Sequence, residues 1–228
     1  MTTAGHERRS ACPSTEDGPG GRLPAGTTWE AGNAEKAETE RDRLLAAAMQ
    51  VLERSGWWGF KVESVLRQAN LSTRSFYRHF EKKNDLLLAL LEVELGRAAI
   101  ALRKRTAAAD SPADKVRAYI AATIDMAYRE DLVKPSSLFA SHWRELLPEY
   151  PEAINRCTER LIAPLAEAIE AGTAGSDFTS SDPLADARAI FYLVAGITAD
   201  QATLGGATPR EEIEHMVLPF IGRAIGLR

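Results

Sequence analysis

A dense group of hydrogen-bonding side chains lies in the short stretch from Ser72 to Lys83. Its members are Ser72, Thr73, Arg74, Ser75, Tyr77, Arg78, His79, Lys82 and Lys83, which carry hydroxyl, guanidinium, imidazole and ammonium groups. Guanidinium groups pair in bidentate fashion with guanine edges or phosphates, whereas serine, threonine and tyrosine hydroxyls reach phosphates. Few structural roles need so many different donors around one short helix, so this combination predicts a surface that contacts DNA.

The surrounding sequence predicts how these side chains are positioned. A short helix is expected from about Val62 to Ala69, followed by a sharp turn at Asn70, because asparagine tolerates a left-handed conformation better than other non-glycine residues. Ser72 is expected to cap the next helix, in which Phe76 and Phe80 lie four residues apart and point to the same interior side. This geometry leaves Thr73, Arg74, Ser75, Tyr77, Arg78 and His79 on the open faces.

Lys82 and Lys83 come directly before a fourth helix, which Asn84 or Asp85 is expected to initiate. Helix N-termini present N–H groups to anions, so lysines at this place strengthen a phosphate clamp. The helix is expected to run to about Arg105, and its first two turns are apolar nearly all round. Such a helix must be covered on more than one side, which suits a connector between two domains.

The segment before this region predicts a tail and one further helix. Residues 1–38 are rich in glycine, proline and small polar residues and lack apolar periodicity, so we expect them to be disordered. A first helix is expected to open at Thr39 and to end at Gly56. Its buried face is formed by Leu44, Ala48, Val51 and Leu52, and the aromatic residues Trp57, Trp58 and Phe60 are expected to plug the small core that follows.

The distribution of charge supports contact with DNA at one end of the protein. The chain has 228 residues and a formal net charge of −4, which read globally argues weakly against nucleic-acid binding. Residues 59–83 contain six basic and two acidic residues, so this segment carries +4 and the rest of the chain −8. A positive segment on an acidic body suits a protein that touches DNA locally, although charge alone is also consistent with a solvated helix face.

Residues 41–91, and above all the run LSTRSFYRHFEKKNDLLLALL, resemble the DNA-binding domain of the TetR family of transcriptional regulators. The family pattern is matched by Ala69, Ser72, Phe76, Tyr77, His79, Phe80, Lys83 and Leu86. The sequence departs from it at Asn70, where the family usually has glycine, at Leu66, where it has a small residue, and at Lys61, where threonine or serine caps the second helix. None of these three positions lies on the expected recognition face.

The remainder of the chain continues in a helical pattern. Helices are expected from Ser111-Pro112 onward, from Ser136 to Leu146, from Pro151 to Ala171, from Asp182-Pro183 to about Leu204, and from a capping box at Thr208–Glu211 to the end. Pro164 and Pro219 are expected to kink or bend their helices. Because no alternating strand pattern is present, the fold class is all-α, with a three-helix domain at 39–86, a helical bundle at 87–228 and about nine helices in all.

The resemblance implies a regulatory role for the bundle. In the family the last two long helices pair with those of a second subunit, which implies a homodimer on a palindromic operator of double-stranded DNA. The family's effector pocket lies within the bundle, and the candidates for its lining here are Met126, Phe139, His142, Trp143, Cys157 and Phe191, with Tyr128 and Asp200 as further polar groups. Ordinary core packing is the alternative for each of these residues, as it is for the dimer faces.

Other classes of function find little support in the sequence. No glycine-rich phosphate loop, G-x-S-x-G elbow or HExxH motif is present, so no catalytic residue is assigned. The four histidines stand singly and the two cysteines do not suggest a disulfide framework, so no metal or cofactor is expected. The chain has no signal pattern and no run long enough to span a bilayer, which predicts a cytoplasmic protein without membrane contact.

The function predicted is therefore that of a transcriptional repressor, released from its operator by a small hydrophobic effector. A regulator without any small-molecule effector is the first alternative. The others are a helical enzyme that uses the helix-turn-helix only for targeting, and an adaptor in which the helix-turn-helix serves only for packing.

Overall fold

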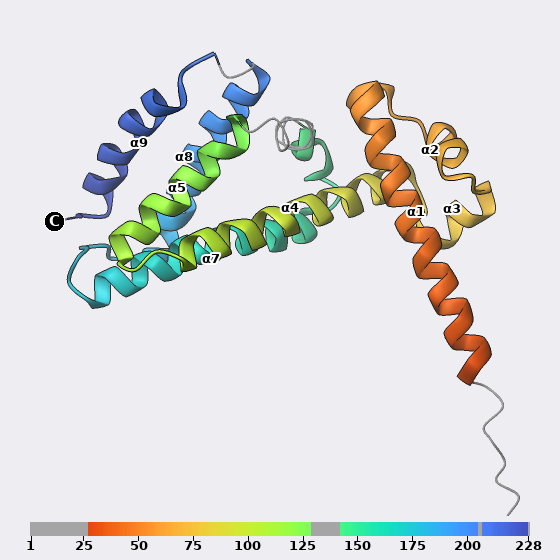
Figure 1. Ribbon diagram of the computed structural model, residues 1–228, viewed down its shortest axis with the longest axis horizontal. Coiled ribbons are helices and arrows are strands. Elements are labelled where there is room, and N and C mark those ends of the chain that lie inside the picture. Colours follow the sequence, from red (N-terminus) through yellow and green to blue (C-terminus); the bar gives the residue numbers. More distant parts are fainter. Residues whose placement is uncertain (1–26, 129–141, 205–206, 228) are drawn as a thin grey trace, which may run out of the picture. The chain divides into compact units, whose positions relative to one another are not determined.

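The protein is built from helices throughout the part that its computed structural model describes, namely residues 27–128, 142–204 and 207–227, with side chains described for 39–128, 142–201, 204 and 207–227. The helices are α1 (Thr27–Gly59), α2 (Val62–Ala69), α3 (Thr73–His79), α4 (Lys83–Ala107), α5 (Pro112–Tyr128), α7 (Pro151–Ala174), α8 (Pro183–Thr203) and α9 (Arg210–Ala224) (Figure 1). Residues 142–146 form a further short helical segment. No strand occurs in these ranges, so the predicted all-α class is confirmed.

The first helix begins earlier than predicted. α1 starts at Thr27 rather than Thr39, so residues 27–38, expected to belong to a disordered tail, are helical, while residues 1–26 lie outside the described part. The prediction relied on apolar periodicity, which this segment lacks, although its alanine and glutamate residues and Lys36 favour a helix. Near its other end α1 is interrupted at Gly56, whose φ of 67° is readily adopted only by glycine, as expected for a stop at this residue.

The chain divides into two compact units, residues 1–38 and 39–228. The second boundary predicted from the sequence, at residue 86, falls inside α4. Within residues 39–228 two apolar clusters can be distinguished, and the first two turns of α4 belong to the first of them, with Leu86, Leu87, Leu90 and Leu91 all buried. The expectation that this apolar helix start is covered on several sides is thus confirmed.

The second cluster lies among α5, α7, α8, α9 and the later part of α4, which runs beside α7 (Figure 1). α5 buries the apolar stripe that its periodicity predicts, namely Val116, Tyr119, Ile120, Thr123, Ile124 and Ala127, and α7 likewise buries Ile154, Cys157, Leu161, Leu165 and Ile169. α7 continues through Pro164 as one helical element. Asp182 caps α8 as predicted, because its side chain accepts a hydrogen bond from the Ala185 N–H at 3.0 Å.

The start of α9 differs from the prediction. Pro209 is the N-cap residue, and no side chain caps this helix, so the capping box expected at Thr208–Glu211 does not form. Thr208 instead uses its backbone, since its N–H donates to the Gln201 side chain at 3.0 Å and its carbonyl accepts from the Tyr128 hydroxyl at 2.6 Å. No helix in the described ranges is long and apolar enough to cross a membrane.

Candidate DNA-binding interface

α2 and α3 form a helix-turn-helix with the predicted boundaries. Asn70 takes the left-handed conformation, with φ 52° and ψ 50°, and its N–H returns to the carbonyl of Arg67 at 3.3 Å. Arg43 of α1 stabilises this turn, because its guanidinium donates a hydrogen bond to the Ala69 carbonyl at 2.5 Å. The Lys61 side chain does not cap α2, as expected for a lysine. The Lys61 carbonyl accepts hydrogen bonds from the N–H groups of Ser64 and Val65.

Ser72 caps the recognition helix. Its hydroxyl accepts a hydrogen bond from the Ser75 N–H at 3.2 Å, which satisfies one of the N–H groups that a helix start leaves without an intrahelical partner. Phe76 and Phe80 are buried behind the helix, as predicted, and join the first apolar cluster. The seven residues of α3 therefore have a fixed start and a fixed inner face.

The outer face of α3 is narrower than predicted. Thr73, Arg74, Tyr77 and Arg78 are exposed, and they form two rows of residues four apart. Ser75 and His79 were expected on the open faces, but Ser75 is buried and the His79 side chain is only 8% exposed, because these two residues form a second row beside Phe76 and Phe80. The prediction was wrong for these two residues, since the buried stripe of a helix is commonly about 100° wide rather than one row.

His79 and Arg78 both approach a carboxylate from α1. Glu40 has a side chain that is only 11% exposed, and its Oε2 accepts from Arg78 Nη1 at 3.0 Å. The same oxygen lies 3.7 Å from Nε2 of His79, an imidazole whose side chain is 8% exposed and whose Nε2 has no hydrogen-bond partner among the described residues. Arg78 is 49% exposed and its guanidinium has four further N–H donors, so it remains available on the outer face.

The turn that joins α3 to α4 is held by Asp85. Its Oδ2 accepts from the N–H groups of Glu81 and Lys82, both at 3.0 Å, so that Asp85 caps α4. Burial of this carboxyl opposes its charged form, but the hydrogen bond from Tyr150 and those from the two backbone N–H groups outweigh burial and lower its pKa. Asp85, one of the two residues expected to initiate the helix, thus serves as its cap.

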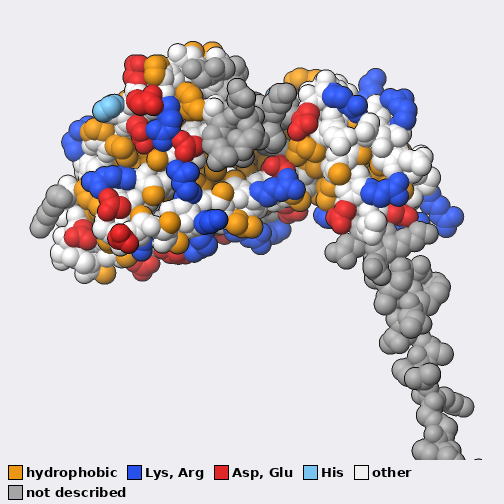
Figure 2. Space-filling view, in the orientation of Figure 1, with side chains coloured by type: hydrophobic (Ala, Val, Ile, Leu, Met, Phe, Trp, Pro, Cys, Tyr) orange, Lys and Arg blue, Asp and Glu red, His pale blue; other side chains and the backbone are white. Residues whose placement is uncertain are grey.

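The two lysines of the predicted phosphate clamp have different surroundings. The Lys82 ammonium pairs with Glu149, a residue just before α7, and the hydrogen bond to this carboxylate raises the lysine pKa. Lys83 places its ammonium 5.6 Å from the ring centroid of Phe60. In Figure 2 several Lys and Arg side chains lie over the region formed by α1, α2 and α3.

The aromatic residues at the end of α1 and just after it are only partly buried in the core. Trp57 and Phe60 are buried as expected, whereas Trp58 is 77% exposed, which corrects the prediction for that residue. The ring of His142, from the short helical segment 142–146, stacks on Trp57 with 5.2 Å between centroids and meets Trp58 edge-on at 5.9 Å. His142 was a candidate effector residue, and its ring contacts lie with the DNA-binding domain.

The other effector candidates do not gather in one place. Trp143 packs against the first apolar cluster, whereas Met126 and Phe191 pack against the second. Cys157 is buried in α7, and burial raises the pKa of its thiol. Phe139 lies outside the described residues. The sequence could not assign these residues to one cluster or the other, because apolar residues on helix faces serve packing and pockets alike.

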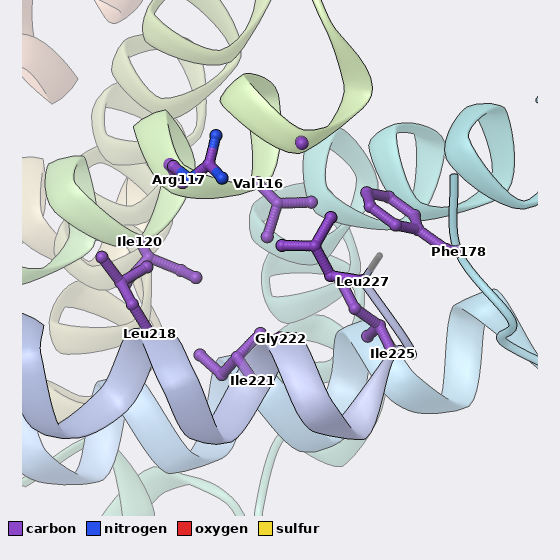
Figure 3. A pocket seen from close by; sticks show the side chains of 10 residues that line it. Val116, Arg117, Ile120, Phe178, Leu218, Ile221, Gly222, Ile225 and Leu227 are labelled. Carbon is purple, nitrogen blue, oxygen red and sulfur yellow. The ribbon is translucent and has the colours of Figure 1, made fainter.

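Two pockets of the described part are lined by other residues than these candidates. One lies between α5, α9 and Phe178, has a cavity volume of about 40 Å³ and is lined mainly by aliphatic side chains (Figure 3). This volume holds water-sized groups only. The other, of about 130 Å³, lies among α4, α5 and α7 next to Pro164.

Sequence reasoning missed four residues that organise the interface, namely Glu40, Arg43, Glu149 and Tyr150. Each contacts the helix-turn-helix region from a distant part of the chain, with separations between 26 and 65 residues. No local pattern identifies such partners. The one available signal was the predicted burial around α3 and α4, which requires neighbours to satisfy buried polar groups.

Comparison with known proteins agrees with this geometry. The family model of bacterial regulatory proteins, tetR family, matches residues 44–90. A DNA-binding transcriptional repressor TetR from Mycobacteroides abscessus is 27% identical over 201 residues, covering 83% of this chain and 92% of that protein. The HTH-type transcriptional regulator BetI from Burkholderia mallei is 34% identical over 89 residues, which cover 39% of this chain and 46% of that relative.

Solved structures share the fold over most of their length. Salmonella enterica GusR matches with a TM-score of 0.65 at 17% identity, covering 82% of this chain and 96% of that one. The transcriptional regulator FadR from Bacillus subtilis, in complex with stearoyl-CoA, matches with a TM-score of 0.64 at 16% identity, covering 78% and 96%. The helix-turn-helix lies inside the matched region, so residues 44–90 are a domain of the tetR family of bacterial regulatory proteins.

Proposed function

We propose that this regulator is a homodimeric repressor that reads a palindromic operator with the outer face of α3 and leaves it when a small apolar effector binds. The observation that carries the DNA-reading role is the separation of α3 into two faces. Ser75 and Phe76 are buried on one side, while Arg74 and Tyr77 are exposed on the other. Arg74 makes no hydrogen bond or ion pair with any described residue, so its guanidinium is available to a base edge or a phosphate.

A gel-shift titration tests this role. The probe is the DNA upstream of the protein's own coding sequence, and the variants are Arg74→Ala and Tyr77→Phe. Arg97→Ala is the matched control, because Arg97 is an exposed arginine of α4 whose partner is the neighbouring Glu94. We expect Arg74→Ala to weaken binding by roughly tenfold or more. Binding that both α3 substitutions leave unchanged would refute the assignment of this face.

The exposed apolar residues of α8 and α9 support dimerisation. α8 buries Ile190 and Val194 in its own core yet exposes an apolar side that includes Leu184, Tyr192 and Leu193. α9 likewise buries Ile213, Val217 and Ile221 but leaves Met216 56% and Phe220 54% exposed. Residues that serve only the core of one subunit would not be exposed to this degree, and large apolar surfaces in soluble proteins mark association sites.

Sedimentation velocity tests the dimer. Phe220→Asp places a carboxylate in the proposed interface without touching the buried row of α9, so we expect it to shift the protein toward monomer. Because one short recognition helix reads few bases, the monomer should also lose most of its operator affinity. A variant that stays dimeric would place the subunit contact elsewhere.

The effector is proposed to be a small molecule with an apolar chain, for which acyl-CoA thioesters are the first class to test. One structure that shares the fold was solved in complex with stearoyl-CoA. Of the candidates from the sequence, Met126 and Phe191 both pack against the second apolar cluster, so these two are the residues proposed to line the site. A coupling of about 1–3 kcal/mol between effector and DNA is sufficient for release. Release of the protein from operator DNA is measured with acyl-CoA, with free fatty acid and with CoA alone, which separates recognition of the acyl chain from recognition of the nucleotide. If none of the three releases the protein, the result favours a regulator without such an effector.

A further inference from the structure

Residues 142–154 lie far from the helix-turn-helix in the sequence but pack into the same apolar core. Leu146 and Ile154 are almost completely buried in the first cluster, together with the inner faces of α1, α2, α3 and the start of α4. The stacking of His142 on Trp57 adds an aromatic contact at one end of this segment. The DNA-binding domain is therefore completed by a piece of chain that the sequence assigns to the regulatory bundle.

Tyr150, at the other end of this segment, is joined by a hydrogen bond to the turn that follows the recognition helix. Its hydroxyl donates to Oδ1 of Asp85 at 2.5 Å. The second oxygen of the same carboxylate accepts from the N–H groups of Glu81 and Lys82. One carboxylate thus connects the Tyr150 hydroxyl with the two peptide groups that lead from α3 into α4.

Glu149 makes a second connection beside the first. Its carboxylate pairs with the Lys82 ammonium and accepts from the Asn84 side-chain amide at 2.6 Å. The Lys82 ammonium also lies 5.8 Å from the ring centroid of Tyr150. The backbone and the side chain of Lys82, a residue proposed to contact phosphate, are consequently both set by residues just before α7.

The protonation states favour this arrangement at neutral pH. Burial and the hydrogen bond to the Asp85 carboxylate raise the pKa of the Tyr150 hydroxyl, so it remains a donor. The pKa of Asp85 is lowered despite its burial, so the carboxylate remains charged and accepts three hydrogen bonds. Hydrogen bonds that involve a charged partner are the stronger and more directional kind.

We propose that Tyr150 is a positioning residue for DNA binding, which acts through Asp85 to fix the turn between α3 and α4. The turn begins directly after Phe80, the last residue of the recognition helix region, and contains Lys82, so its geometry sets the relation between the base-reading face and the phosphate-contacting lysines. The role rests on the proposed operator binding. It connects residues just before α7 with the turn that follows α3, through Lys82 and the first turn of α4.

The test compares two tyrosine-to-phenylalanine substitutions in the full-length protein. Tyr150→Phe removes the hydroxyl but keeps the ring, and we expect it to weaken operator binding by roughly tenfold. Tyr119→Phe is the matched control, because its buried hydroxyl donates to the Leu161 carbonyl at 3.0 Å within the second cluster. The control should lower the melting temperature while operator affinity stays within about twofold of the wild type.

A double-mutant cycle in operator affinity separates positioning from general stability. Asp85→Asn weakens the same connection, so the Tyr150→Phe/Asp85→Asn protein should bind no more weakly than Asp85→Asn alone. Circular dichroism and sedimentation establish that each variant is folded and dimeric. The duplex is one selected from random sequence by the wild-type protein.

The possible outcomes are distinct. If Tyr150→Phe binds as the wild type does, or if its effect adds fully to that of Asp85→Asn, Tyr150 is not a positioning residue, while the proposed operator binding stands. If Tyr119→Phe weakens binding as much as Tyr150→Phe, the loss reflects stability and the role is likewise overturned. If the wild-type protein selects no duplex at all, the proposed function itself fails.

Discussion

Replacement of Arg78 by alanine should affect both the stability of the DNA-binding domain and its affinity for DNA. The substitution removes the guanidinium that donates to Glu40 Oε2 at 3.0 Å. Glu40 is then left as a nearly buried carboxylate, with Nε2 of the His79 imidazole 3.7 Å from its Oε2. Arg74→Ala is the matched comparison, since Arg74 is on the same outer face but has no such partner.

The magnitude follows from the burial of the two partners. A hydrogen bond between charged groups contributes about 1.5–3 kcal/mol when desolvated, and an exposed ion pair contributes about 0–1 kcal/mol. With the Arg78 side chain 49% exposed and that of Glu40 11%, we expect a loss of about 1–2 kcal/mol. For a protein of this size, that is a fall in melting temperature of about 2–8 °C. Arg74→Ala should leave the melting temperature unchanged.

The assay combines differential scanning calorimetry with fluorescence anisotropy on labelled operator DNA. Arg78→Ala should melt earlier and bind more weakly. In the double variant Arg78→Ala/Glu40→Gln the orphaned charge is removed, so the melting temperature should recover while the affinity remains low. An unchanged melting temperature for Arg78→Ala would refute the structural role of the ion pair. Full recovery of affinity in the double variant would show that Arg78 makes no contact with DNA.

Three further substitutions test separate parts of the structure. Ser72→Ala removes the cap of α3 and should cost about 1 kcal/mol in chemical denaturation, with a parallel loss of operator affinity; a stable variant would mean that the cap contributes nothing. Glu149→Gln removes the charge beside Lys82, so affinity for any duplex should rise. The slope of log Kd against the logarithm of the salt concentration should steepen by about one unit. An unchanged slope would show that Lys82 contacts no phosphate. Gly172→Ala places a Cβ 2.2 Å from a buried phenyl ring and should destabilise the bundle by about 1–3 kcal/mol. Gly96→Ala is its control and should not destabilise the protein, because Gly96 is a helical glycine whose added Cβ would have nothing within 4 Å. Equal effects of the two substitutions would contradict the close packing of α7.

The helix-turn-helix could be predicted almost residue by residue because its signals are local. The boundaries of α2, the left-handed Asn70 and the cap at Ser72 each depend on residues within one turn of one another. The apolar stripes of α5 and α7 were predictable for the same reason, since periodicity reports a buried face directly. These parts account for most of the all-α fold.

The errors arose where partners come from distant parts of the chain. The carboxylate beside Arg78 and His79 comes from Glu40 in α1, and the pairing of Lys82 depends on Glu149 before α7. The helical residues before Thr39 lacked the apolar periodicity on which the first helix was located. The lining of a pocket is still harder to predict, because the residue types of Met126 and Trp143 suit packing against a neighbouring helix as well as contact with a ligand.

The same distant partners change the electrostatic description of the interface. The segment 59–83 carries +4 in the sequence, but Glu40 and Glu149 lie against Arg78 and Lys82 in the folded protein, so two of its positive charges are offset by carboxylates from elsewhere in the chain. Non-specific affinity for DNA depends mainly on the number of phosphates neutralised, so the two carboxylates should weaken it on every sequence. They also hold the guanidinium and the ammonium in defined positions, and preorganised donors lose less conformational entropy when they meet the correct site. A repressor has to find one operator among many competing sequences, and for it the ratio of specific to non-specific affinity matters more than either value. The acidic residues that oppose DNA binding by charge alone are thus the ones expected to make it selective.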